Sequence, residues 1–70
     1  MSVYKFIELV GTSPDSWEKA AQAAINVASQ TLRDLRIAEI TMLDLVIEEG
    51  KITQYRSKVK LSFKVERELG

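Results

Sequence analysis

The stretch GTSPDSWEKAAQAAINVASQTL, residues 11–32, decides the fold, because its apolar side chains recur at the spacing of one helix face. Ser13 or Ser16 is suited to cap the start of this helix, and Arg33 and Arg36 suit its other end. The apolar face consists of Trp17, Ala20, Ala21, Ala24, Ile25, Ala28 and Leu32. Its four alanines predict a thin helix that approaches a sheet closely.

Strand patterns lie on both sides of this helix. Residues 3–10 (VYKFIELV) are rich in β-branched and aromatic side chains, and Gly11 follows them. Because apolar side chains occur at both parities of this strand, we expect it to be covered on both faces. Residues 37–48 and 51–66 predict two further strands joined by a two-residue turn at Glu49-Gly50, where glycine supplies a positive φ.

A two-residue turn at this place fixes the register of the hairpin, because opposite residue numbers then sum to 99. The face expected under the helix pairs Ala38 with Leu61, Ile40 with Val59, Met42 with Ser57 and Val46 with Thr53, and continues to Phe63 and Val65. The reverse face pairs Glu39 with Lys60, Thr41 with Lys58, Leu43 with Arg56, Leu45 with Gln54 and Ile47 with Ile52, with Ile37 and Ser62 at its end.

The reverse face would expose an apolar cluster made of Leu43, Leu45, Ile47 and Ile52. Such a patch is a liability in a monomer, so a partner subunit is expected to cover it. The alternative is that the strand over residues 37–48 bends or bulges and brings these side chains into its own core.

Composition excludes several classes of protein. The 70 residues include ten basic and ten acidic side chains, 46% hydrophobic residues, and neither Cys nor His. Zinc sites of the usual type, cysteine nucleophiles, Ser-His-Asp relays and disulfides are therefore excluded. We expect one domain over residues 1–70, located in the cytoplasm, because neither a membrane span nor a signal peptide is recognisable. A chain this short has a marginal core, which favours oligomerisation.

The residues themselves argue against two functional classes, enzymes and nucleic-acid-binding proteins. An enzyme is the least expected, because one thin helix and a small sheet offer little concave surface for an acid-base pair. A basic stripe formed by Arg56, Lys58, Lys60 and Lys64 alternates onto one face and would suit nucleic-acid phosphates. It lacks interleaved aromatic side chains and faces Glu39, so a solvated or inter-subunit charged face is favoured.

Three segments give the chain a family resemblance: YKFIELVGTSPDSWEKAAQAA, ASQTLRDLR and EEGKITQYRSKVKLSFKVE. They resemble the dodecins over nearly the whole chain. The resemblance implies an α+β fold in β-α-β-β order, with a three-stranded antiparallel sheet partly wrapped around one amphipathic helix. It also implies a hollow homododecamer that binds or buffers flavin without catalysis.

The resemblance also assigns ligand-binding positions. The family's flavin-stacking Trp corresponds to Ile37 here, and the Gln that hydrogen-bonds the ring edge corresponds to Arg56. Ile37 cannot stack as an aromatic ring does, and Arg56 cannot accept a hydrogen bond, so binding of FMN or riboflavin is expected to be weakened or lost. Lys64 matches a basic position near bound phosphates. Trp17 matches a structural aromatic residue of the family and is not a relocated stacking platform.

The absence of the stacking Trp brings the chain nearer to a subgroup described as calcium-binding dodecins. Calcium prefers six to eight oxygen ligands, and the metal candidates here are Asp15 and Asp44. Asp44 is expected opposite Tyr55, where either a cation or a basic side chain from a neighbour would meet it; an ion pair or a helix cap is the favoured alternative for each aspartate. The expected function is therefore non-enzymatic storage of a small ligand or ion in a dodecamer, with flavin buffering or a purely structural assembly as alternatives.

Overall fold

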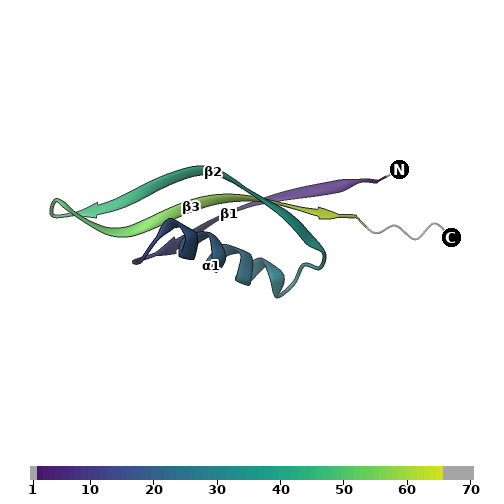
Figure 1. Cartoon of the computed structure of the whole chain (residues 1–70), viewed down its shortest axis with the longest axis horizontal. Coiled ribbons are helices and arrows are strands. Elements are labelled where there is room, and N and C mark those ends of the chain that lie inside the picture. The colour runs from purple at the N-terminus through teal and green to yellow at the C-terminus, as the bar shows by residue number, and fades with distance from the viewer. Residues whose placement is uncertain (1, 66–70) are drawn as a thin grey trace.

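The computed structural model describes residues 2–65, which form three strands and one helix. The elements follow in the order β1 (Tyr4–Ser13), α1 (Trp17–Ser29), β2 (Leu35–Glu48) and β3 (Lys51–Lys64). The strands make one antiparallel sheet in the order β1-β3-β2, and α1 lies along one side of it (Figure 1). The predicted β-α-β-β order is confirmed. Residue 66, the predicted end of the last strand, lies outside the described residues.

The start of α1 is capped as the sequence suggests. The Ser16 hydroxyl accepts a hydrogen bond from the Lys19 amide at 3.0 Å, and the Ser13 hydroxyl accepts one from the Asp15 amide at 3.0 Å. The other end differs from the prediction, since the helix ends at Ser29 and its last turn carries no basic residue. Arg33 and Arg36 therefore lie beyond the helix and cannot complement its dipole in the expected way.

The alanine face lets α1 approach β1 closely. Ala20, Ala24 and Ala28 are buried against the sheet. At Gly11 of β1 a Cβ atom would lie 1.8 Å from the carbonyl oxygen of Ala20, so only glycine is accommodated without movement of the helix. The predicted thin helix is thus confirmed, and Gly11 is the position that makes its close approach to the sheet possible.

The register divides the sheet into two faces, because directly opposed residues of antiparallel strands share a face. The helix-covered face carries Ile7, Leu9, Gly11 and Ser13 of β1 and Tyr55, Ser57, Val59 and Leu61 of β3. The open face carries Tyr4, Phe6, Glu8, Val10 and Thr12 of β1, Arg56, Lys58, Lys60, Ser62 and Lys64 of β3, and Ile37, Glu39, Met42, Asp44 and Val46 of β2. Phe6 and Val10 are each more than half exposed, so the expected cover on both faces of β1 is not found within one chain.

The hairpin between β2 and β3 is interrupted by a register shift. Glu48 lies opposite Lys51 and Ala38 opposite Leu61, as the turn at Glu49 (φ 52°) and Gly50 (φ 75°) dictates. Residues 42–46 are displaced by one position, between irregularities at Ile40/Met42 and Val46/Ile47. Several predicted pairs are therefore wrong: Met42 lies opposite Lys58, Leu43 opposite Ser57, Leu45 opposite Tyr55 and Val46 opposite Gln54.

The shift also splits the apolar cluster predicted on the reverse face. A displacement by one residue transfers side chains from one face to the other, so Leu43 and Leu45 lie on the side of the sheet that carries α1. Ile47 and Ile52 stay on the other side. The bulged alternative is thus the correct one for the backbone, yet all four side chains remain exposed, because α1 packs mainly on β1 and β3.

The core of a single chain is small. Among the described residues the buried hydrophobic side chains are Ala20, Ala24, Ala28, Val59 and Leu61, with Ile7, Leu9, Ala21, Ile25, Leu32 and Leu35 packed around them. The molecule is elongated, measuring 58 × 20 × 13 Å, and its hairpin tip extends past the helix (Figure 1). Its radius of gyration is 14.8 Å, compared with about 11 Å for a compact domain of this length. One chain alone therefore leaves much of its apolar surface uncovered.

No helix within residues 2–65 has the length and apolarity to cross a membrane.

We expect Gly11→Ala to lower the free energy of unfolding by about 1–3 kcal/mol, because the added methyl group forces α1 away from the sheet. Thermal or urea unfolding at a fixed protein concentration measures the change. Thr12→Ala is the matched control, since Thr12 is the neighbouring residue and lies on the open face. Equal stability of the two variants would contradict the close approach.

Candidate ligand and ion site

A bidentate ion pair joins β2 and β3 on the open face. The Arg56 Nε atom donates to Oδ1 of Asp44 at 2.7 Å, and Arg56 Nη2 donates to Oδ2 at 2.8 Å. The residues lie directly opposite each other because of the register shift. Both carboxylate oxygens of Asp44 thus have a guanidinium partner in parallel geometry. The basic partner anticipated for Asp44 from a neighbour is supplied by the same chain.

The ion pair changes the protonation of both groups. The hydrogen bonds from Arg56 hold the pKa of the Asp44 carboxyl below its ordinary value. Partial desolvation opposes this shift, and the positive charge of Arg56 makes the smallest contribution, which also lowers the pKa. The same hydrogen bonds raise the pKa of the Arg56 guanidinium. Asp44 is therefore an anion and Arg56 a cation throughout the neutral and mildly acidic range.

Trp17 fixes the backbone beside this pair from the helix-covered side. Its indole Nε1 donates to the carbonyl oxygen of Asp44 at 3.0 Å, and its ring meets Tyr55 edge-on with centroids 5.2 Å apart. The hydroxyl of Ser57 donates to the Trp17 carbonyl at 2.8 Å. Trp17 thus joins the first turn of α1 to both β2 and β3, which supports its interpretation as a structural residue.

A shallow hollow of about 170 Å³ surrounds the ion pair and is lined by Val10, Met42, Asp44, Arg56 and Lys58. Lys58 lies 4.0 Å from a carboxylate oxygen of Glu8, so this lysine is only loosely paired. The hollow therefore combines apolar walls with one carboxylate and two cations.

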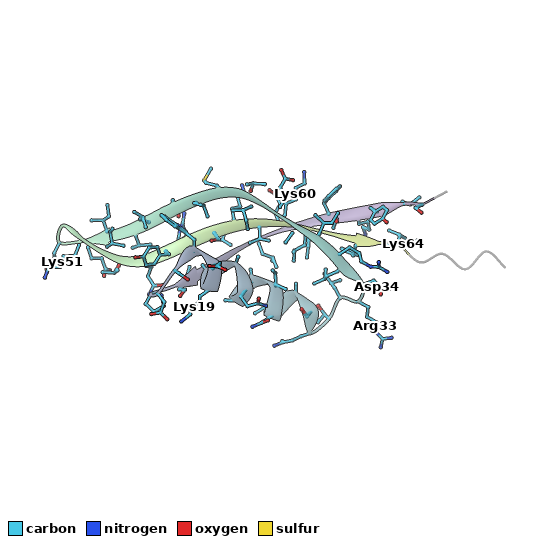
Figure 2. All side chains as sticks on the ribbon, viewed as in Figure 1. Lys19, Arg33, Asp34, Lys51, Lys60 and Lys64 are labelled. Carbon is cyan, nitrogen blue, oxygen red and sulfur yellow. The ribbon has the colours of Figure 1, made fainter. Side chains whose placement is uncertain are left out.

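Oppositely charged side chains also lie next to each other on the rest of the open face. Lys60 lies opposite both Glu8 and Glu39, and its ammonium nitrogen is 4.7 Å from the centroid of the Phe6 ring. Figure 2 shows Lys60 pointing away from the helix. The predicted basic stripe thus shares one face, but its members have acidic and aromatic neighbours.

The candidate ligand residues share the open face without meeting in one pocket. Ile37 lies opposite Ser62, which is six residues along β3 from Arg56, or roughly 20 Å. Lys64 is eight residues from Arg56, roughly 26 Å along the same strand. A small ligand that touches both Ile37 and Arg56 would therefore have to use side chains from more than one subunit.

The two candidate metal ligands lie in different surroundings. Asp15 is exposed and lies 3.4 Å from Lys19, its partner one helical turn away. Asp44 lies in mid-sheet with Arg56. Residues 2–65 contain no group of three or more acidic side chains placed to hold a metal ion. A single chain therefore falls short of the oxygen ligands that calcium requires.

The sequence did not predict the direct contact between Asp44, the candidate metal ligand, and Arg56, the candidate residue at the flavin ring edge. The two were placed at separate sites because an unbroken hairpin register puts Tyr55 opposite Asp44. The available signal was the poor fit of a carboxylate opposite tyrosine, together with an arginine one position away.

The Asp44–Arg56 pair predicts a pH dependence of stability. Because the pKa of Asp44 is lowered in the folded chain, its contribution is complete above the unfolded pKa of about 3.9 and is lost as pH falls through the lower folded pKa. We expect the difference in unfolding free energy between the wild type and Asp44→Asn to shrink as pH decreases from 6 to about 3. Urea unfolding at each pH measures it, and a constant difference would contradict the pairing.

Comparison with known proteins identifies the family. The dodecin family profile matches residues 3–66. The chain is 47% identical over 66 residues to the calcium dodecin of Mycobacterium tuberculosis, covering 93% of this chain and 92% of that protein. The crystal structure of that calcium dodecin, described as having a novel calcium-binding site, has a TM-score of 0.82 at 41% identity and 99% coverage of both chains. The dodecin of Streptomyces coelicolor has a TM-score of 0.90 at 39% identity, with 96% of both chains covered, and a dodecameric assembly fits such structures. The chain belongs to the dodecin family.

Proposed function

We propose that this chain is a non-enzymatic subunit of a hollow homododecamer that binds and stores a small ligand or an ion. The observation that carries the proposal is the uncovered apolar surface on both sides of the sheet. Phe6, Val10, Ile37 and Met42 are exposed on the open face, and Ile40, Leu43 and Leu45 are exposed beside α1. This amount of apolar surface is typical of an interface between subunits.

Calcium is the favoured ligand in this proposal. Its support is the similarity to the calcium dodecin of Mycobacterium tuberculosis, together with the absence of soft or imidazole ligands from the sequence. Asp44 and Asp15 are the proposed metal ligands. Because one chain offers too few oxygens, the proposed site is completed by side chains or backbone carbonyls of other subunits.

Flavin is the second candidate ligand and is proposed to bind weakly. Ile37 stands at the stacking position and is 65% exposed, and Arg56, at the ring-edge position, is already bound to Asp44. An aliphatic side chain loses the stacking contribution of an aromatic ring, about 0.5–1.5 kcal/mol. Lys64 is the proposed partner of a flavin phosphate. A purely structural assembly is the remaining alternative, and it predicts no specific ligand.

The assembly is tested by sedimentation. At micromolar concentration we expect a particle of twelve times the 7.9 kDa mass of the chain. Leu43→Lys should reduce this mass, because Leu43 is 49% exposed in one chain and its substitution disturbs the interface more than the subunit core. A folded wild-type monomer at this concentration would contradict the proposal, and circular dichroism of the variant separates dissociation from unfolding.

Flavin binding is tested by quenching of riboflavin fluorescence. We expect weak or undetectable quenching for the wild type, and tighter binding for the double variant Ile37→Trp with Arg56→Gln. The stacking contribution alone corresponds to roughly 2- to 13-fold in affinity. Ile37→Phe provides an intermediate aromatic variant. Submicromolar binding by the wild type would overturn the assignment of weakened flavin binding.

A further inference from the structure

Two threonines mark the ends of the displaced segment of the hairpin. Thr41 of β2 and Thr53 of β3 have no directly opposed residue on the facing strand. The bulge at Thr41 adds one residue to β2 and the bulge at Thr53 adds one to β3, so the second cancels the first. Only residues 42–46 are displaced, and the pairs on both sides of them keep the unbroken register, which the turn sets.

Each of these threonines still contacts the residue that it would oppose in the unbroken register. In that register Thr41 lies opposite Lys58 and Thr53 lies opposite Val46. In the structure, the Thr41 hydroxyl donates to the carbonyl oxygen of Lys58 at 3.3 Å, and the Thr53 hydroxyl donates to that of Val46 at 3.4 Å. Both hydrogen bonds are long and therefore weak. The two registers thus differ by one residue position, and both threonines already lie beside their alternative partners.

Little packing holds residues 42–46 in the observed register. Within the described residues, β2 is an edge strand that pairs with β3 alone, and α1 packs mainly on β1 and β3. Met42, Leu43 and Leu45 are 55%, 49% and 36% exposed, so exchanging their faces changes apolar burial little. Burial of one face is what specifies a register strongly, and this segment lacks it in a single chain.

Two contacts of Asp44 favour the observed register. Its carboxylate pairs with Arg56 on the open face, and the indole of Trp17 donates to its carbonyl oxygen at 3.0 Å from the other side. A slip of one residue, about 3.3 Å along the strand, breaks both contacts and places Asp44 opposite Tyr55. Exposed ion pairs contribute little to stability, so the preference for the observed register is modest.

We propose that residues 42–46 form a register switch, which slides by one residue between the observed and the unbroken register. In the observed register the open face carries the Asp44–Arg56 pair, while Leu43 and Leu45 lie on the side of α1. In the unbroken register the two leucines complete the four-residue apolar cluster on the open face, and Arg56 loses its carboxylate partner. The switch thus exchanges a neutral ion pair for an apolar surface.

This exchange sets which face of the hairpin a second copy of the chain covers. The hairpin extends past α1, so no element of the same chain covers its tip (Figure 1). A copy that packs on the open face favours the unbroken register, and a copy that packs beside α1 favours the observed one. The effect on assembly rests on the proposed function, whereas the exchange of registers within one chain does not.

Engineered disulfides report the register, because the chain contains no cysteine and a disulfide requires Cβ atoms about 3.8 Å apart. Val46→Cys with Gln54→Cys joins residues that are opposed in the observed register. Leu45→Cys with Gln54→Cys joins residues that are opposed only in the unbroken register, since they now lie on different faces. Leu43→Cys with Gln54→Cys is the matched control, because these residues are opposed in neither register.

The closure rate of each disulfide is measured in the assembled protein with oxidised glutathione, after sedimentation has verified assembly. We expect the Val46 pair to close fastest. The Leu45 pair should close at least about tenfold faster than the Leu43 control, because a local slip is more frequent than unfolding. Equal rates for the Leu45 pair and the control would overturn the switch, because both disulfides would then depend on unfolding.

The contacts at the bulges and at Trp17 are tested in the same way. Thr41→Val with Thr53→Val removes the two hydroxyl contacts but keeps the shape and strand preference of the side chains. Trp17→Phe removes the indole donor that binds the Asp44 carbonyl. In both backgrounds the Leu45 pair should close faster and the Val46 pair more slowly. Unchanged rates in both would refute the switch.

Hydrogen exchange of the unmodified chain decides the question if the cysteine variants do not assemble. Amides of residues 42–46 should exchange at least about tenfold faster than those of residues 38–40, which lie on the same strand in the unbroken register. Equal protection of the two segments would overturn the switch.

The effect on assembly is tested with the two closed disulfides. The Leu45 and Val46 pairs fix opposite faces for Leu43, so the protein concentrations at which the two assemblies dissociate should differ at least about tenfold. Equal dissociation would refute the effect of the switch on assembly. A folded wild-type monomer would instead refute the proposed function and leave the closure rates as the test of the switch.

Discussion

The one-residue displacement of residues 42–46 in β2 is the constraint on which the other features of the sheet depend. A slip of one residue inverts the side chains of a strand, and here the inversion is confined to a short segment between two irregularities. Within it, Asp44 reaches Arg56 on the open face while Leu43 and Leu45 turn to the side of α1. The indole of Trp17 binds the Asp44 carbonyl from that side, so the segment is held from the helix and from β3 together.

The close contact between Gly11 and Ala20 explains why the core of one subunit is tightly packed but small. Because Gly11 lacks a Cβ atom, the backbone of α1 can rest on β1 at Ala20, and small side chains fill the narrow layer between them. A narrow layer buries little apolar area, so Val59 and Leu61 are the only large side chains fully enclosed among the described residues. The stability of the fold then depends on apolar surface that other subunits can cover, which the elongated shape also favours.

The sequence predicts the order of elements, the helix face and the hairpin turn, because each follows from local periodicity or from a residue with special backbone freedom. It does not predict the displaced register, since neither irregularity is marked by glycine or proline. That omission explains the misplaced pairs of Met42 and Leu43 and the separation of Asp44 from Arg56. The family resemblance assigns an expected role to positions such as Ile37, but it does not show which side chains of one chain meet in space.

The candidate ligand residues lie too far apart to form one site within a single chain. Ile37, Arg56 and Lys64 are spread along one sheet face, and Asp15, which precedes α1, is paired separately with Lys19. No small ligand spans these positions on one chain, so any site that uses several of them is built by assembly. Each subunit contributes a neutral chain in which the basic residues of β3 lie beside carboxylates of β1 and β2. Among the described residues, Asp44 and Arg56 form the shortest of these ion pairs, and both carboxylate oxygens are engaged within one chain, so a neighbouring subunit meets the two charges as a neutral pair.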